Sequence, residues 1–265
     1  MNNGTTSPPL AHTTANAAPD LSIVIPVYNE EHRIRQSLQD VLDFVHRHQI
    51  AAEIIVVDDG STDGTATELQ QVAAHAPEII VHTIPHAGKA GAVLAGLNAA
   101  HGTIAGFIDA DMATPLSTWF ECEKALAHGA NIAIASREGI GAHRVGEPAY
   151  RHFMGRAFNG LVRLLLLPGI HDTQCGFKFF DRKALEIILP RTMLYRDAGT
   201  VTVPRVTAFD VELLYIAKSH GCNIAIIPIT WTYGTHSKVN PLTDTLQNLR
   251  DVLLVRWHGW RGRYA

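Results

Sequence analysis

The stretch FIDADMATP, residues 107–115, ends an apolar run with two aspartates, Asp109 and Asp111, that are separated by one alanine. Two carboxylates about 4 Å apart repel each other by about 1 kcal/mol in water and about 4 kcal/mol at an effective dielectric near 20. Oxygen ligands at this spacing suit Mg²⁺ or Mn²⁺, which take one or two carboxylates together with substrate phosphates. The alternative is a solvated turn, and the surrounding sequence has to decide between the two.

On both sides of this stretch, short apolar runs alternate with helical patterns. The apolar runs predict strands at 21–28, 53–59, 78–84, 102–111 and 131–137. Helices are predicted at 30–48, from 61 onward, at 88–100 and at 115–128. This alternation predicts an α/β fold with a mostly parallel central sheet and helices on both faces.

The second half of the chain is less regular. Helices are predicted at 150–167, 181–189, 209–219 and 241–257, and strands within 173–181 and 222–231. Residues 190–207 contain Pro190, Gly199 and Pro204 and predict a long loop. The sequence shows neither an internal repeat nor a clear domain boundary.

Composition excludes several classes of protein. The 265 residues carry a formal net charge of −3, whereas nucleic-acid binders are usually basic with clustered Lys and Arg, so no nucleic-acid partner is expected. Three cysteines without paired-ligand spacing, Cys122, Cys175 and Cys222, favour a reducing compartment. No stretch approaches the roughly 20 apolar residues of a membrane span, and none is predicted.

Polar clusters follow four of the predicted strands: Asn29-Glu30, Asp58-Asp59, Asp109-Asp111 and Ser136-Arg137. Ligands on parallel α/β sheets bind at the carboxyl ends of strands. Because all four clusters would meet at one edge of one sheet, together they predict a binding site there.

Two of the neighbouring motifs can be read in two ways. In Asp58-Asp59-Gly60-Ser61, a carboxylate could accept hydrogen bonds from a base or ribose, or the run could only cap its own helix. Gly88-Lys89-Ala90-Gly91 could hold an anion at a helix N-terminus, or form a simple glycine turn, and it lacks P-loop spacing. Phosphates also need cationic donors. The candidates are Arg137, Arg144, Arg151, Lys178 and Lys238.

Taken together, SIVIPVYNEEHRI, EIIVVDDGSTDGT, GKAGAVLAGL, FIDADMATP, DTQCGFKFFD and FDVELLYIA resemble the inverting glycosyltransferase family 2, which has the GT-A fold. The resemblance runs in the family's order over roughly residues 21–255. It is strongest to the branch of dolichyl-phosphate and other polyprenyl-phosphate β-glucosyltransferases. It implies a GT-A catalytic domain at 21–240. Residues 1–20, which are rich in Pro, Thr, Asn and Ala, predict a disordered tail before that domain.

The resemblance also implies roles for single residues. Those that would bind the nucleotide sugar are Pro26, Tyr28, Glu30, Asp58, Lys89, Asp109 and Lys238. Asp111, with Asp109, would bind Mg²⁺ or Mn²⁺, and Arg137 would neutralise phosphate oxygens. The residues near the sugar or acceptor would be Gln174, Lys178, Arg144 and Arg151. Asp210 stands where relatives with hydroxyl acceptors keep a base, and the alternative is a helix N-cap.

The implied reaction moves a hexose, with glucose from UDP-glucose favoured, onto a polyprenyl phosphate. A hydroxyl acceptor or a non-catalytic sugar-nucleotide binding module are the alternatives. The family's usual Gly-Lys-Gly is Gly88-Lys89-Ala90 here, the Arg four residues on is Leu94, and Val206-Thr207-Ala208 stand where relatives have Trp.

A lipid acceptor raises the question of membrane contact. The basic and apolar segment 150–167, and residues 241–265 with Trp257, Trp260 and several arginines, have the composition of interfacial helices. The alternative is a core helix followed by a basic tail. The sequence therefore predicts a cytoplasmic protein in peripheral contact with the cytoplasmic face of a membrane.

Overall fold

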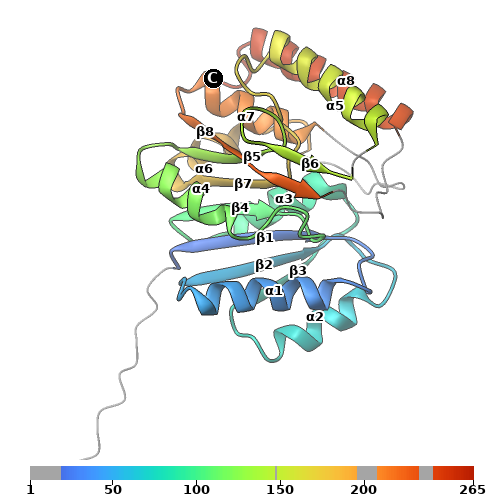
Figure 1. The fold of residues 1–265 in the computed structure, drawn as a ribbon, viewed down its shortest axis with the longest axis vertical. Coiled ribbons are helices and arrows are strands. Elements are labelled where there is room, and N and C mark those ends of the chain that lie inside the picture. The colour runs from blue at the N-terminus through green and yellow to red at the C-terminus, as the bar shows by residue number, and fades with distance from the viewer. Residues whose placement is uncertain (1–18, 147, 196–207, 233–240) are drawn as a thin grey trace, which may run out of the picture.

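The computed structural model describes residues 19–146, 148–195, 208–232 and 241–265, with the backbone alone at 149–151 and 241–246. The predicted tail at 1–20 and loop at 190–207 lie largely outside these residues. Figure 1 shows the arrangement of helices and strands.

The main sheet has seven strands in the order β3-β2-β1-β4-β7-β5-β8. These are β1 (Leu21–Val27), β2 (Ala52–Asp58), β3 (Ile79–Thr83), β4 (Ile104–Ile108), β5 (Ile132–Ser136), β7 (Phe177–Asp181) and β8 (Ile224–Pro228). All neighbouring pairs are parallel except those that β7 forms with β4 and β5. The prediction of a mostly parallel sheet is confirmed, with one antiparallel strand inside it.

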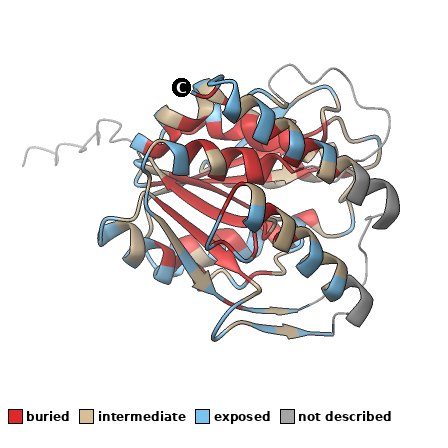
Figure 2. Ribbon diagram, turned by 90° about the horizontal axis from the view of Figure 1, so that it is seen from above, coloured by how far each residue is buried: buried red, intermediate tan, exposed pale blue. Residues whose placement is uncertain are grey.

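Helices cover both faces of the sheet, as predicted. Successive strand residues point to opposite faces, both faces are apolar, and each is therefore buried under helices. On one face lie α1 (Ile34–Arg47), α2 (Thr65–Ala73) and α4 (Thr118–Ala127), which pack on residues such as Ile23 and Ile54. On the other lie α3 (Gly88–Ala99), α6 (Arg182–Ile188) and α7 (Phe209–Ser219), which pack with Val24 and Ile55. Figure 2 shows the buried strands between the two layers.

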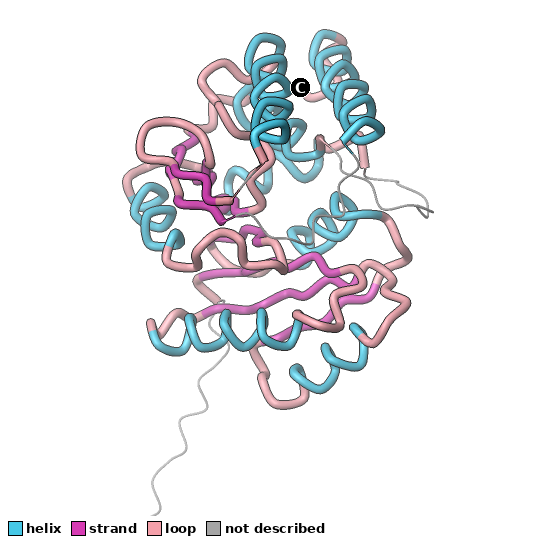
Figure 3. The backbone as a smooth tube through the Cα atoms, turned by 45° about the vertical axis from the view of Figure 1, so that its right-hand side comes forward, coloured by secondary structure: helices cyan, strands magenta, loops and turns pink. Residues whose placement is uncertain are grey.

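Two further helices form the outer edge of the molecule. The long helices α5 (Ala149–Leu165) and α8 (Pro241–Trp260) pack on each other, and α8 also packs on α7 (Figures 1 and 3). A short 3₁₀ turn, Leu189–Arg191, follows α6. None of the helices in the described ranges is long and apolar enough to span a bilayer.

The predicted strand at 222–231 is two strands instead of one. It divides at Ile229, so that β8 stays in the main sheet while β9 (Thr230–Thr232) pairs in parallel with β6 (His143–Val145). Strand β6 was not predicted, because its three residues are too short to show a period. The predicted helix at 30–48 begins at Ile34 instead, after a turn over residues 31–33.

Candidate active site

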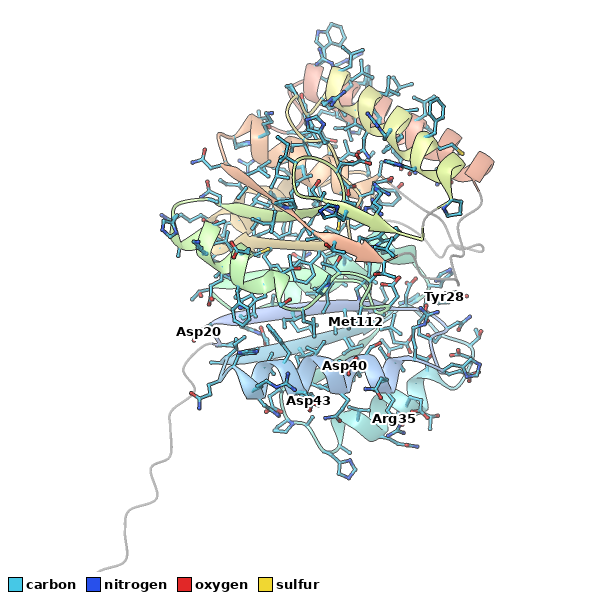
Figure 4. All side chains as sticks on the ribbon, in the orientation of Figure 1. Asp20, Tyr28, Arg35, Asp40, Asp43 and Met112 are labelled. Atoms are coloured by element: carbon cyan, nitrogen blue, oxygen red, sulfur yellow. The ribbon has the colours of Figure 1, made fainter. Side chains whose placement is uncertain are left out.

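The loops that follow β1 and β2 are joined at the carboxyl edge of the sheet, where Val27 lies opposite Asp58. The Asn29 backbone N–H donates to Ser61 Oγ at 3.0 Å, and the Thr62 N–H donates to Asn29 Oδ1 at 2.8 Å. Asn29 has φ of +53°, a left-handed conformation that asparagine tolerates better than most residues. These bonds fix the backbone just after Tyr28, which lies at this end of β1 (Figure 4).

Asp58 and Asp59 are both buried but serve different loops. Asp58 Oδ1 accepts a hydrogen bond from the Ser61 N–H at 3.0 Å, within its own turn. Asp59 instead accepts from the backbone N–H groups of Ala87 and Gly88, at 2.6 and 2.9 Å. Asp59 thus binds the start of α3, just before Lys89. The alternative in which the pair only caps its own helix is wrong for Asp59, and α2 begins without a side-chain cap.

A stacked pair of rings lies beside these carboxylates. The Tyr28 and His86 ring centroids are 4.1 Å apart with an interplanar angle of 15°, and His86 Nδ1 lies 2.7 Å from Asp59 Oδ2. Of the other predicted nucleoside contacts, Pro26 is half-buried in β1 opposite Val57, and Glu30 pairs with Arg33 at 2.7 Å. The planar rings and the Asp58 carboxylate are suited to a nucleobase.

Asp109 and Lys89 form an ion pair across the site. Asp109 follows β4, and its backbone N–H donates to Gly176 O at 3.0 Å. A Cβ atom at Gly176 would overlap the Asp109 carboxylate, so the observed position of that carboxylate requires glycine at residue 176. The structure therefore brings Lys89, at the start of α3, against one aspartate of the Asp109–Asp111 pair.

Asp109, Asp111 and Arg137 line one pocket of about 60 Å³, together with Gly176, Trp231 and neighbouring residues. Desolvation in this pocket, and next the charge of Asp109, raise the pKa of Asp111, while the Ala113 N–H, Lys89 and Arg33 oppose that rise. Burial is the larger cause of the raised pKa, and repulsion between the two adjacent carboxylates adds to it; a bound cation would oppose both effects.

Arg137 is fixed by a buried carboxylate that the sequence reasoning missed. Its Nε and Nη2 donate to Asp172 at 2.7 and 2.8 Å, and its backbone N–H donates to the same group at 2.9 Å. Burial alone would raise the pKa of Asp172, but Arg137 holds it well below its usual range. Trp231 lies beneath the guanidinium groups of Arg137 and Arg144, at 5.2 and 5.8 Å from its ring centroid. Arg144 is therefore close to Arg137, and its Nε donates to the Arg137 carbonyl oxygen at 3.2 Å; phosphate binding by either residue stays a prediction.

The predicted acceptor residues are placed unequally. Gln174 Nε2 is buried and has no hydrogen-bond partner among the described residues, and its contact with a sugar or acceptor stays a prediction. Lys178 is fully buried, and its Nζ donates to Cys175 O at 2.5 Å and to Asp210 Oδ1 at 2.7 Å. A direct contact of Lys178 with an acceptor stays a prediction. The side chain of Arg151, and Lys238, lie outside the described residues.

Asp210 is buried in the first turn of α7, where the N-cap residue is Ala208. The alternative in which Asp210 is that helix's N-cap is therefore wrong. Burial raises the pKa of Asp210, although the charges of Lys178 and Lys89 oppose the rise. Lys89 thus lies near both Asp109 and Asp210, and negative and positive groups alternate from Asp109 through Lys89 and Asp210 to Lys178.

A metal ion would find an incomplete set of protein ligands. No group of three or more His, Cys, Asp or Glu side chains positioned to hold a metal occurs in the ranges that the structure describes. Asp109 and Asp111 supply carboxylate oxygens alone, which fits a hard cation that takes its remaining ligands from water and a diphosphate. The pair fits Mg²⁺ or Mn²⁺ bound together with a substrate.

The sequence reasoning also missed His86, Trp231 and the role of Asp59. Only Asp59 gave a local signal, as the second aspartate after a strand. The contacts of His86 and Trp231 join segments far apart in the chain, and no local pattern marks them.

A mostly parallel sheet with an Asp-x-Asp pair at its carboxyl edge is the arrangement of GT-A glycosyltransferases. Solved structures share this fold. Mannosyl-3-phosphoglycerate synthase from Rubrobacter xylanophilus has a TM-score of 0.65 at 18% identity, over 92% of this chain and 76% of that one. Glucosyl-3-phosphoglycerate synthase from Mycobacterium tuberculosis, in complex with Mn²⁺, UDP-glucose and phosphoglyceric acid, has a TM-score of 0.63 at 20% identity, over 90% and 79%.

The sequence comparisons are more specific. The family model of glycosyl transferase family 2 matches residues 22–189, and the chain belongs to this family of glycosyltransferases. Dolichyl-phosphate beta-glucosyltransferase of Homo sapiens is 34% identical over 251 residues, which cover 89% of this chain and 74% of the human protein. The protein of the same name from Saccharomyces cerevisiae is 31% identical over 259 residues, with coverage of 89% and 74%.

Proposed function

We propose that this glycosyltransferase moves glucose from UDP-glucose to a polyprenyl phosphate of the dolichyl type. The observation that carries the proposal is the similarity, over most of the chain, to proteins named dolichyl-phosphate beta-glucosyltransferase. The site supports it independently, because carboxylates, a base platform and arginines meet at one edge of the sheet.

The donor would lie across the sheet edge from β2 to β5. Tyr28, with Pro26 and Glu30 near it, would contact the nucleoside, and Asp58 would accept a hydrogen bond from the base or ribose. Lys89 and Asp109 would bind the middle of the donor, and Arg137 its diphosphate. Lys238 would add a second cation there.

The metal would be held by Asp111 and Asp109, whose oxygens suit Mg²⁺ or Mn²⁺. When bound, such a cation supplies positive charge that stabilises a departing diphosphate. The solved glucosyl-3-phosphoglycerate synthase with Mn²⁺ and UDP-glucose supports this choice of cofactor through the shared fold.

The transfer itself needs little proton chemistry. An oxygen of the acceptor phosphate attacks the anomeric carbon, the bond from that carbon to the UDP oxygen breaks, and UDP leaves with the electron pair. A phosphate is already anionic near pH 7, so no strong base is required. Gln174, Arg144 and Arg151 would bind the sugar or acceptor. Lys178 would support the acceptor site indirectly, by holding the Asp210 carboxylate in place. We infer a cytoplasmic enzyme that contacts the membrane peripherally to reach this acceptor, with residues 21–240 as its catalytic domain.

The decisive experiment is a transfer assay with the purified full chain. UDP-glucose, GDP-mannose and UDP-N-acetylglucosamine are each offered with a short polyprenyl phosphate and Mg²⁺ or Mn²⁺. We expect a polyprenyl-phosphate glucose product from UDP-glucose and loss of turnover on chelation of the metal. Transfer to a polyprenol or sugar hydroxyl but not to the phosphate would refute the acceptor, and preference for GDP-mannose would refute the donor.

A further inference from the structure

Helix α5 presents an apolar stripe to solvent. Phe153, Ala157, Gly160 and Leu164 follow one another at spacings of four, three and four residues, so they share one face of the helix. Phe153 is 75% exposed and Leu164 83% exposed. Large side chains so exposed are unusual on a helix that already packs its other face into the core through Val162.

The neighbouring helix α8 repeats this pattern. Leu253, Trp257 and Trp260 are spaced by four and three residues and are 52%, 39% and 74% exposed. Arg261 and Arg263 lie over the Trp257 ring, at 5.0 and 4.8 Å from its centroid. Helices α5 and α8 lie side by side along the outer edge (Figures 1 and 3). Their exposed residues, among them Phe153 and Leu164 of α5 and Leu253, Trp257 and Trp260 of α8, are here called the α5–α8 surface.

Among the side chains of α5, α8 and the C-terminal residues that the structure describes, the exposed charges have one sign. They belong to Arg156, Arg163, Arg250, Arg256, Arg261 and Arg263. Within 152–170 and 247–265 the only acidic side chain is Asp251, which is buried and accepts a hydrogen bond from Tyr195. Exposed apolar rows flanked by arginine and tryptophan suit the interface of an anionic bilayer.

A pocket of about 110 Å³ lies beside the stripe of α5 and is lined by Arg156, Asn159, Gly160, Arg163, His171 and Glu138. Arg163 Nη1 lies 2.8 Å from His171 Nδ1 and must be the donor, so the imidazole hydrogen is on Nε2. Glu138, the one acidic group, is paired with Arg144 and His152 at 3.1 and 2.9 Å. Two arginines and a histidine therefore line a space large enough for one phosphate.

Gly160 has no packing reason to be glycine. A Cβ atom built there meets nothing within 4 Å, as does one at Gly155. Glycine inside a helix costs about 1 kcal/mol relative to alanine. At position 160 any side chain would project at the mouth of the pocket, so glycine keeps it open.

We propose that the α5–α8 surface docks on an anionic membrane and that the Arg156–Arg163–His171 pocket holds the phosphate of a lipid headgroup. This deepens the proposed function, because it names the surface through which an enzyme with a lipid acceptor meets the bilayer. The residues involved are separate from the Asp109–Asp111 site.

The test is co-sedimentation of the full chain with vesicles of phosphatidylcholine alone or mixed with phosphatidylglycerol. We expect binding only to the anionic vesicles, weakened by salt. Arg156→Gln with Arg163→Gln should reduce that binding by about tenfold or more. The matched control, Arg47→Gln with Lys124→Gln, removes the same charge from exposed positions on α1 and α4 and should bind like the wild type.

Gly160→Leu separates a pocket from a merely apolar and basic surface. It keeps every charge and enlarges the apolar stripe, so a surface without a pocket would bind vesicles more tightly, whereas filling the pocket should weaken binding severalfold. Equal or tighter binding of Gly160→Leu would overturn the proposal. So would a failure of the wild type to bind, together with a dimer that Leu164→Asp dissociates, since a second copy would then cover the face.

Sugar transfer to a short polyprenyl phosphate in solution, without vesicles, keeps the two proposals distinct. The Arg156, Arg163 and Gly160 variants should transfer at the wild-type rate there. Vesicle binding as expected without any transfer by the wild type would refute the proposed function and leave the docking surface standing. Transfer by the wild type without vesicle binding would do the reverse.

Discussion

The Arg137 guanidinium depends on one carboxylate, since Asp172 accepts three hydrogen bonds from that residue while fully buried. The pKa of Asp172 is lower in the folded protein than the value near 3.9 that an aspartate has in an unfolded chain. As pH falls, Asp172 therefore takes up its proton first in the unfolded state. The pair therefore stabilises the fold fully above about pH 4, and the contribution declines as pH falls toward the folded-state pKa.

We expect Asp172→Asn to lower the free energy of unfolding by about 3 kcal/mol at pH 7, because it removes the negative charge to which a mostly buried guanidinium donates two hydrogen bonds. The loss should be smaller at pH 3. Denaturant unfolding at both values measures it, with the exposed Asp40→Asn on α1 as control. An equal loss at both pH values would contradict the assigned pairing.

The Lys178–Asp210 pair makes a separate prediction that bears on the acceptor. Removing one partner of a buried pair leaves an uncompensated charge and costs about 3–5 kcal/mol, whereas replacing both with apolar groups costs much less. Lys178→Met and Asp210→Asn should each destabilise the fold strongly, and Lys178→Met with Asp210→Met should recover most of the loss.

The double variant also decides whether Asp210 is a base. A general base contributes about 10²–10⁴-fold to the rate. With a phosphate acceptor the stable double variant should keep turnover within about tenfold of the wild type. A fall of 10²-fold or more would favour a hydroxyl acceptor.

Helix α3 packs directly against β1, and a glycine in α3 makes this close approach possible. A Cβ atom at Gly96 would overlap the Val24 side chain of β1, whereas one at Gly155 in α5 meets nothing within 4 Å. Gly96→Ala should destabilise the protein by about 1–3 kcal/mol through overpacking. Gly155→Ala, the matched control, should stabilise it by about 0.5–1 kcal/mol through helix propensity. Denaturant unfolding compares them, and a stabilising Gly96→Ala would contradict the close approach.

Which elements the sequence could predict depends on how local their signals are. The strands before Asp58 and Asp109 are continuous apolar runs, so the sheet and the polar clusters at its edge were predictable. The antiparallel direction of β7 and the pairing of β6 with β9 depend on segments that meet only after folding. For the same reason Trp231 beneath Arg137, and Asp59 bound to the start of α3, could not be predicted from local pattern.

In the molecule as a whole, the site is assembled from two parts of one sheet. β1, β2 and α3, with the loops beside them, position the stacked Tyr28 and His86 rings, the Asp58 and Asp59 carboxylates and Lys89. β4, β5, β7 and β9 position Asp109, Asp111, Arg137 and Trp231. Lys89 connects the two parts directly, because it belongs to α3 and forms an ion pair with Asp109, which follows β4. A ligand that spans both parts should therefore stabilise the entire fold.

We expect UDP with Mn²⁺ to raise the melting temperature beyond what either gives alone. A ligand at 100 times its dissociation constant adds about 2.7 kcal/mol, which corresponds to roughly 5 °C for a chain of 265 residues. Asp111→Asn should abolish the increment that Mn²⁺ adds to UDP, because it removes a metal ligand, while the smaller shift with UDP alone should persist through Tyr28 and Asp58. Thermal unfolding followed by circular dichroism measures each shift, and Asp40→Asn serves as the control that should keep both. If Asp111→Asn retained the full Mn²⁺ increment, the cation would bind elsewhere. Some other group would then have to offset the repulsion between Asp109 and Asp111.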